Sequence, residues 1–352
     1  MTTILQENEI KECVAINYEL IPIIEDAFVS LAKGLTTMPP IMRLDIKEYH
    51  GEVDVKTAYI KGLDSFAIKV SPGFFNNPTL GLPTTSGMMI LLDTKTGILK
   101  SILLDKGYLT DVRTAIAGAI AAKHLSNKDI STVGIIGAGM QAKLQLQALM
   151  LVRQPTTAYV WGRNDKKVKQ FVSENCSELK IKLIQANNPE EVCEKSDMLI
   201  TTTPSTEPLI KSEWIRKGMH ITAMGSDAEH KNELDPKIIK ECDLYVADKQ
   251  SQTAVLGELH HAIRVKLVSS EKKYNELGSI INKDVQGRSS KDSITVCDLT
   301  GTGVQNTAIA RYAFDVRPLT SLLIMFPSSL NFFSEETSFA LIAWCNSPKT
   351  VV

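Results

Sequence analysis

Apolar residues recur along the chain with two different periods, and together these predict an α/β protein. Residues 7–33 carry apolar side chains at roughly helical spacing up to Gly34, which predicts one long amphipathic helix. Four apolar segments then predict strands at 53–60, 66–70, 87–92 and 98–104. Thr-Lys-Thr-Gly at 94–97 predicts a hairpin turn between the last two, so the strands before residue 108 are expected to be mostly antiparallel.

Beyond residue 108, helical and strand patterns alternate. We expect an alanine-rich helix at 111–125 and further helices at 140–152 and 166–176. Strands are expected at 132–136, 157–161, 198–202, 220–224, 243–247 and 295–299. This alternation predicts a Rossmann-type doubly wound parallel sheet beside a smaller α+β domain. The aromatic-rich segment after Tyr312 is only weakly periodic, and it either packs on the N-terminal domain or extends outside the fold.

Composition narrows the possible partners and the compartment. The 352 residues include 39 Lys and Arg against 40 Asp and Glu, and this balance argues against a nucleic-acid partner. The six cysteines form no C-x-x-C pair, which favours reduced thiols and no metal site. No secretory signal and no apolar run of about 18 residues is evident, so we expect a cytoplasmic protein without a membrane partner.

A glycine motif predicts a dinucleotide site. Gly137-x-Gly139-x-x-Ala142 follows an apolar strand and opens a helix, the context in which this motif is informative. Gly137 permits the tight turn, Gly139 lets the backbone approach a pyrophosphate, and the helix N-terminus supplies N–H donors. The alternative is a glycine turn that binds nothing.

The next strand leaves the choice between NAD and NADP open. Its tip carries no acidic residue, so Arg163 either meets a 2′-phosphate or stacks on adenine while Asp165 reaches the ribose. Thr202 lies in a hydroxyl-rich loop after the 198–202 strand. Such a loop lines the ligand crevice or caps a following helix.

Candidate reacting groups are few. Hydride transfer at a carbon that bears nitrogen requires a cation for the substrate carboxylate, a group that carries a proton and a pocket that excludes water. Arg43, Lys56 and Lys69 are candidate cations, and Lys69 stands among apolar residues whose burial would lower its pKa. The alternative for either lysine is a surface side chain whose stem packs on apolar neighbours.

Two further residues stand at element ends. Arg113 lies in the first turn of the alanine-rich helix, where a bound anion, or an ion pair with Asp111 or another acid, would explain it. Asp227 follows the 220–224 strand, at the edge of the sheet where ligands bind, and it either exchanges a proton or caps a helix. The histidines lack metal-ligand spacing, so we predict no metal.

Three blocks in order, LTDVRTAIAGAIAAKHL, GAGMQA and MGSDAEHKNELDP, resemble the ornithine cyclodeaminase/mu-crystallin family over about residues 5–315. The resemblance implies a substrate and dimerisation domain at 1–118, joined by 312–352, and a Rossmann domain at 119–311. It also implies a homodimer. Family members act as cyclodeaminases, alanine dehydrogenases, ketimine reductases or hormone-binding crystallins.

The resemblance also implies roles for individual residues. Lys69 matches a substrate lysine, Asp227 the catalytic acid, and Arg43 and Lys56 substrate-binding positions. Thr300 and Gly301 are expected to contact substrate. Together with the motif residues, the expected cofactor contacts are Thr84, Thr85, Arg113, Gly137, Gly139, Met140, Gln141, Arg163, Thr202, Met224, Gly225, Ser226 and Lys231.

The segments MPPIMRLD, QSQTAVLGELHHAI and TVCDLTGTGVQ are similar to the branch that holds iminosuccinate reductases and ectoine-utilisation cyclodeaminase-like proteins. That similarity implies reduction of a small imino acid, iminosuccinate to L-aspartate, with NAD as the expected cofactor and NADP as the alternative. The cluster of cations fits a dicarboxylate better than ornithine. The alternatives are ornithine cyclodeamination, with Glu52 or Asp54 holding the distal amine, and a crystallin-like protein that only binds NADPH and a small ligand.

Overall fold

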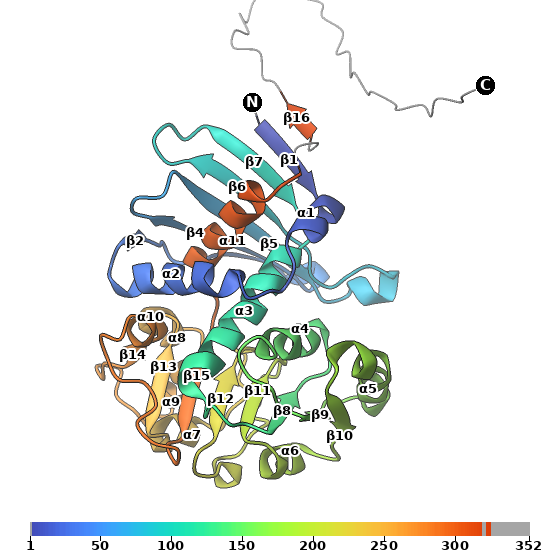
Figure 1. The fold of residues 1–352 in the computed structure, drawn as a ribbon, viewed down its shortest axis with the longest axis vertical. Helices are drawn as coiled ribbons and strands as arrows, with labels where there is room; N and C mark the ends of the chain where they lie inside the picture. The colour runs from blue at the N-terminus through green and yellow to red at the C-terminus, as the bar shows by residue number, and fades with distance from the viewer. Residues whose placement is uncertain (1, 319–321, 325–352) are drawn as a thin grey trace, which may run out of the picture.

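Two eight-stranded sheets dominate the computed structural model, which describes residues 2–318 and 322–324 (Figure 1). The first has the order β16-β1-β7-β6-β5-β4-β2, with β3 also paired to β4. Its pairings are antiparallel except β1 with β7, as the hairpin pattern predicted. Its strands are β1 Thr2–Gln6, β2 Thr36–Thr37, β3 Met42–Ile46, β4 Gly51–Ile60, β5 Ser65–Phe74, β6 Met88–Asp93, β7 Leu99–Leu104 and β16 Leu322–Ile324.

The second sheet is entirely parallel, in the order β10-β9-β8-β11-β12-β15-β13-β14. The chain builds outward from β8 in one direction and then from β11 in the other, so a switch point lies between these two strands. This confirms the doubly wound fold. The strands are β8 Thr132–Ile136, β9 Thr157–Trp161, β10 Lys182–Gln185, β11 Met198–Thr201, β12 His220–Ala223, β13 Leu244–Ala247, β14 Asn275–Glu276 and β15 Thr295–Asp298.

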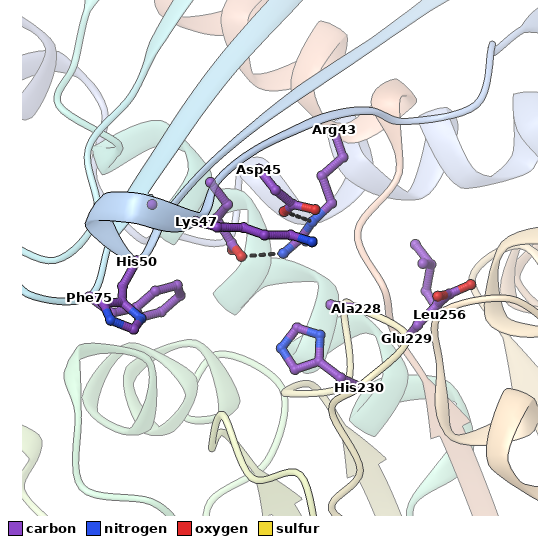
Figure 2. A pocket seen from close by; sticks show the side chains of 11 residues that line it. Arg43, Asp45, Lys47, His50, Phe75, Ala228, Glu229, His230 and Leu256 are labelled. Atoms are coloured by element: carbon purple, nitrogen blue, oxygen red, sulfur yellow. Dashed lines mark hydrogen bonds and ion pairs between the residues drawn. The ribbon is translucent and has the colours of Figure 1, made fainter.

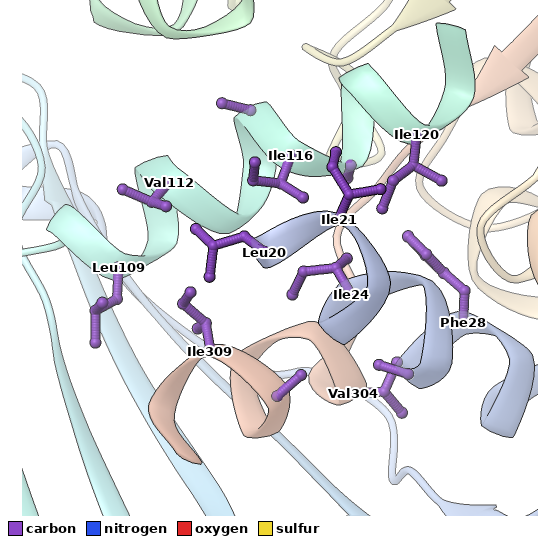
Figure 3. Packing of buried hydrophobic residues seen from close by; sticks show 14 of the residues in the cluster. Leu20, Ile21, Ile24, Phe28, Leu109, Val112, Ile116, Ile120, Val304 and Ile309 are labelled. Carbon is purple, nitrogen blue, oxygen red and sulfur yellow. The ribbon is translucent and has the colours of Figure 1, made fainter. Parts of the chain in front are cut away.

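Helix α3 joins the two sheets, and α11, although it follows β15 in the chain, packs back on β4 and β5 (Figure 1). Figure 3 shows side chains of α2, α3 and α11 meeting in one core, among them Ile24, Ile116 and Ile309, all fully buried. Each contributes about 1.5–3 kcal/mol by leaving water. The helices are α1 Glu7–Cys13, α2 Leu20–Ala32, α3 Tyr108–Leu125, α4 Met140–Leu149, α5 Asp165–Leu179, α6 Pro189–Lys195, α7 Pro236–Glu241, α8 Gln250–Thr253, α9 Glu258–Arg264, α10 Leu277–Ile281 and α11 Gly303–Asp315.

The prediction of one helix over 7–33 is wrong, because the segment forms α1 and α2 with an extended break between them. Val14 ends α1 in an extended conformation, and the Asn17 side chain accepts a hydrogen bond from Glu19 N to start the next turn. Pro22 lies in the first turn of α2, where a missing N–H costs little. The alanine-rich helix is confirmed, but it starts three residues early, since Asp105 accepts a bond from Leu109 N at 2.8 Å.

Parts of the C-terminal prediction lie outside the described residues. Residues 322–324 pair antiparallel with β1, and residues 319–321 and 325–352 are not described. The expected division of the chain at 118 falls within α3 and stays a prediction. No helix in the described ranges combines the length and apolar character that a membrane crossing requires. Those ranges also hold no cluster of three or more His, Cys, Asp or Glu suited to a metal ion.

Candidate functional site

A group of buried cations lies where the first sheet meets α3. Lys56 of β4 and Lys69 of β5 are directly opposed across the two strands, and their residues are only 5% and 3% exposed. Arg113 of α3 is 6% exposed. Opposed side chains in an antiparallel pair are neighbours, so two like charges are held together inside the protein. The interpretation of these lysines as surface side chains is therefore wrong.

None of the three cations forms a salt bridge with a carboxylate in the described ranges. Lys56 Nζ donates to the carbonyls of Thr300 and Gly301, each at 3.4 Å. Arg113 Nη1 donates to Gln305 Oε1 at 2.9 Å, and its buried Nε has no partner. The Lys69 side chain forms no hydrogen bond or ion pair with a described residue. The site therefore carries positive charge that an anion can balance.

Arg113 is not paired with Asp111, contrary to one of the interpretations above. The Asp111 carboxylate instead accepts a bond from Gln141 Nε2 at 2.9 Å, across the contact between α3 and α4. Burial raises the pKa of Asp111, and this hydrogen bond opposes that effect. Gln141, an expected cofactor contact, thus already has a protein partner.

Burial sets the protonation behaviour of the three cations. Burial together with the charges of Lys56 and Arg113 lowers the pKa of Lys69 well below its ordinary 10.5. Burial also lowers the pKa of Lys56, and it lowers that of Arg113 to about 10. Lys69 is consequently well suited to release and recover a proton in this site.

Asp227 approaches these cations from the second sheet. It lies in the loop after β12, and Lys231 Nζ donates to its Oδ1 at 2.6 Å. Burial raises the pKa of Asp227, but the charges of Lys231, Lys56 and Lys69 outweigh burial and hold it below 3.8. The carboxylate also acts electrostatically on Arg113. Charged groups from the two sheets therefore interact within one site. The interpretation of Asp227 as a helix cap is wrong, because no helix starts after it in this loop.

A cavity of about 620 Å³ opens between the β3–β4 hairpin and the loop after β12 (Figure 2). Arg43 lies on its wall and bonds to Asp45 at 3.0 Å and to Glu52, with Asp54 Oδ1 3.7 Å away. The guanidinium already has three carboxylate neighbours, which balance its charge and so weaken its attraction for a substrate carboxylate. The lining residues are Arg43, Asp45, Lys47, His50, Gly51, Glu52, Phe75, Ala228, Glu229, His230 and Leu256.

The glycine turn combines a position that admits only glycine with an uncovered helix start. Gly137 has φ +122°, and a Cβ on it would lie 2.5 Å from Thr202 Oγ1, so only glycine fits. Gly139 is the N-cap of α4, and a Cβ there would meet nothing within 4 Å. The space beside Gly139 is therefore open, and the first-turn N–H groups of α4 that follow it are of the kind that bind a dinucleotide pyrophosphate.

The end of β9 has the expected lack of an acidic residue. Arg163 is exposed and forms no ion pair with a described residue, so its guanidinium can reach a phosphate or a base. Asn164 accepts a bond from Lys167 N at 3.1 Å and caps α5. Thr202 caps no helix, and its hydroxyl donates to Ile136 O at 3.2 Å.

The remaining predicted positions are dispersed around these features. Thr84 is half-buried and Thr85 exposed in the connection between β5 and β6, and Met140 is exposed at the start of α4. Met224 and Gly225 begin the loop that carries Asp227.

Sequence reasoning missed three buried acids that hold the loops of the site, Glu233, Asp248 and Glu258. Asp248 accepts bonds from Gly301 N at 2.7 Å and Thr300 Oγ1 at 3.0 Å, and so fixes the turn whose carbonyls meet Lys56. Burial raises the pKa of Asp248 to about 6. Asp248 directly follows the predicted 243–247 strand, and that position was its signal in the sequence.

The sequence and the fold are similar to those of known proteins. Residues 1–317 match the ornithine cyclodeaminase/mu-crystallin family. An uncharacterized cyclodeaminase of Sinorhizobium fredii is 51% identical over 312 residues, which are 88% of this chain and 94% of that protein. An archaeal alanine dehydrogenase dimer with bound NAD superposes with a TM-score of 0.83 at 33% identity, covering 90% of this chain and 95% of the other. The iminosuccinate reductase of Paracoccus denitrificans in complex with NAD⁺ gives 0.82 at 26%, covering 90% and 96%.

Proposed function

The chain belongs to the ornithine cyclodeaminase/mu-crystallin family, and from this premise we propose that it is an NAD-dependent reductase of small imino acids. Within that class we propose iminosuccinate as the substrate and L-aspartate as the product. One observation carries the proposal: Lys56, Lys69 and Arg113 are buried together without a carboxylate partner among the described residues. Three such cations suit a substrate with two carboxylates.

NAD is the cofactor that the glycine turn and the related structures support, and it supplies the hydride when bound. Gly137, Gly139 and the first turn of α4 would hold its pyrophosphate. Thr202, Met224 and Gly225 stand at the adjacent strand ends, where they would contact the rest of the dinucleotide, whereas the buried Ser226 hydroxyl already donates to Glu258. Arg163 leaves room for NADP as the alternative.

Residues from the first sheet, from α3 and from the loops of the second sheet together bind the substrate and move the proton. Lys56 and Arg113 hold the carboxylates, and Thr300 and Gly301 orient Lys56 through their carbonyls. Lys69, with its lowered pKa, gives a proton from Nζ to the nitrogen that becomes the amine. Asp227 stays ionised and stabilises the positive charge of the protonated imine. Lys231 orients Asp227.

A second candidate, cyclodeamination of a diamino acid, is favoured by the acids around Arg43. Asp45, Glu52 and Asp54 outnumber the one guanidinium, so this part of the cavity suits a distal ammonium better than a second carboxylate. Ornithine turnover to proline and ammonia with no net change in NADH would support this candidate. Net NADH oxidation with iminosuccinate would support the reductase.

We also propose that the protein is a homodimer. Large apolar side chains are exposed on the first sheet, at Met42 and Leu44 of β3, and in the β5–β6 connection, at Leu80 and Leu82. Exposed apolar side chains of this kind are typical of association surfaces, and the related alanine dehydrogenase structure is a dimer. Light scattering of the purified protein should give twice the 38.8 kDa chain mass.

The experiment for the activity is direct. Iminosuccinate is generated freshly from oxaloacetate and ammonia, and loss of NADH or NADPH absorbance is followed with and without the protein. Lys69→Ala should bind the cofactor and lose turnover, which distinguishes an enzyme from a protein that only binds NADPH and a ligand. Failure of the wild-type protein to oxidise either cofactor would reject the assignment to iminosuccinate.

A further inference from the structure

Two buried carboxylates close the loop that carries Asp227, residues 224–234. Glu233 is 0% exposed and Glu258, the first residue of α9, is 1% exposed. Neither forms a salt bridge with a described residue, so hydrogen bonds alone stabilise them. Burying an acid without a cation costs free energy of folding. The positions of the hydrogen-bond donors indicate which part of the protein these two acids hold in place.

Glu258 accepts four hydrogen bonds, all from this one loop. Its Oε1 accepts from the Ser226 hydroxyl and from Glu233 N at 2.8 Å. Its Oε2 accepts from Asn232 Nδ2 at 2.7 Å and from Leu234 N at 3.2 Å. Ser226 directly precedes Asp227, and the other donors follow it. One side chain therefore ties together the two ends of the segment that presents Asp227.

Glu233 fixes the same loop to the second sheet. It accepts from Gly225 N at 2.8 Å, from Thr203 N at 2.6 Å and from Thr201 Oγ1 at 2.6 Å. A Cβ on Gly225 would lie 2.2 Å from Thr203 O and 2.5 Å from the Glu233 carboxyl carbon, so the backbone here has no room to shift. Glu258 consequently acts on a loop that is anchored at its start.

We infer that Glu258 is a positioning residue that sets the place of the Asp227 carboxylate opposite Lys69. The inference rests on the proposed function, in which Asp227 faces the reacting nitrogen. Glu258 acts through Ser226 and the loop backbone. Displacement of a reacting group by about 1 Å can lower turnover about 100-fold, so a loosened loop would reduce catalysis before it reduced cofactor binding.

Glu258→Gln tests this inference with little change of shape. Burial raises the pKa of Glu258 to about 8, so the assays are run above pH 8, where its carboxyl is ionised. Both oxygens then accept hydrogen bonds, whereas the amide nitrogen of glutamine cannot accept, so at least one donor of the loop loses its acceptor. We expect kcat to fall about 10- to 100-fold, while NADH affinity measured by fluorescence changes less than about threefold. Amide hydrogen exchange of residues 225–234 should become faster. The exposed Glu241→Gln is the matched control and should behave as wild type.

Ser226→Ala removes a single bond and provides a second, milder variant. Its kcat should fall about two- to tenfold, as expected for one hydrogen bond. If Glu258→Gln does not fold, kcat, NADH affinity and hydrogen exchange of Ser226→Ala test the positioning role of Glu258. Wild-type kcat together with unchanged exchange in the folded variants would overturn the inference. If the wild-type protein turns over no imino acid, the proposed function fails, and exchange of the loop still tests the role of Glu258.

Discussion

Replacement of Lys69 by methionine should stabilise the protein and abolish its activity. Methionine keeps an unbranched side chain of similar length while removing the charge that faces Lys56. Opposed Cβ atoms lie about 5 Å apart, and two like charges at that separation repel by about 3 kcal/mol at an effective dielectric constant of about 20, which serves as the upper bound here. Part of this cost is already relieved because the pKa of Lys69 is lowered, so we expect a gain of about 1–3 kcal/mol. At roughly 2–4 °C per kcal/mol, the melting temperature should rise measurably.

The pH dependence gives this prediction a second test. Lys69 has a lower pKa in the folded protein than its ordinary 10.5, so between these values the unfolded chain binds more protons. Wild-type stability should therefore rise with pH across that window, and the advantage of Lys69→Met should shrink as the pH approaches 10.5. Thermal unfolding at several pH values measures this, with the exposed Lys95→Met as control. A Lys69→Met protein that is no more stable than Lys95→Met, or that retains turnover, would refute the reasoning.

Three further predictions follow from the glycine turn, the strand tip and the buried acids. Gly137→Ala should lower the free energy of unfolding by about 1–3 kcal/mol, because the position has a positive φ and a Cβ there would meet Thr202; urea titration measures this. Gly139→Ala should fold normally and weaken NADH binding. Equal stability of the two variants would contradict the different roles given to the two glycines. Arg163→Ala should raise the KM for NADPH about tenfold and leave that for NADH unchanged, since a charge-assisted hydrogen bond contributes about 1.5–3 kcal/mol; an equal effect on both cofactors would instead indicate stacking on adenine. Burial raises the pKa of Glu258 to about 8, above 4.5 in the unfolded chain, so the folded protein binds the extra proton and the free energy of unfolding should fall as pH rises between these values. Glu258→Gln should lack this pH dependence, which amounts to at most about 1.4 kcal/mol per pH unit. The same slope in Glu258→Gln as in the wild type would show that Glu258 does not titrate in this range.

The sequence predicted the elements whose pattern is local. Six strands of the second sheet and the Gly137 turn follow from apolar runs and a motif that each lie within about ten residues, whereas the short strands β10 and β14 were missed. The break between α1 and α2 was missed because the apolar spacing continues through Val14, although the backbone there is extended. Strand β3 was missed because its side chains are mostly exposed and it exists by pairing with β4.

The site shows the same division. Lys69 stood out because a lysine among apolar strand residues is unusual, and Asp227 because it follows a strand end. The role of Glu258 could not be predicted, since its four donors lie 24 or more residues away in another loop. The ion pairs of Arg43 with Glu52 and Asp54 were missed for a related reason. They form because β3 pairs with β4, and the sequence pattern does not specify that pairing.

Transfer of label tests the central claim most directly. The protein is mixed with NADH carrying deuterium at both C4 positions, oxaloacetate and ammonia, and the aspartate formed is examined by mass spectrometry and NMR. The account predicts one deuterium on the α-carbon of L-aspartate for each NADH oxidised, and none with Lys69→Met. Absence of labelled aspartate with the wild-type protein, or equal labelling with Lys69→Met, would contradict it.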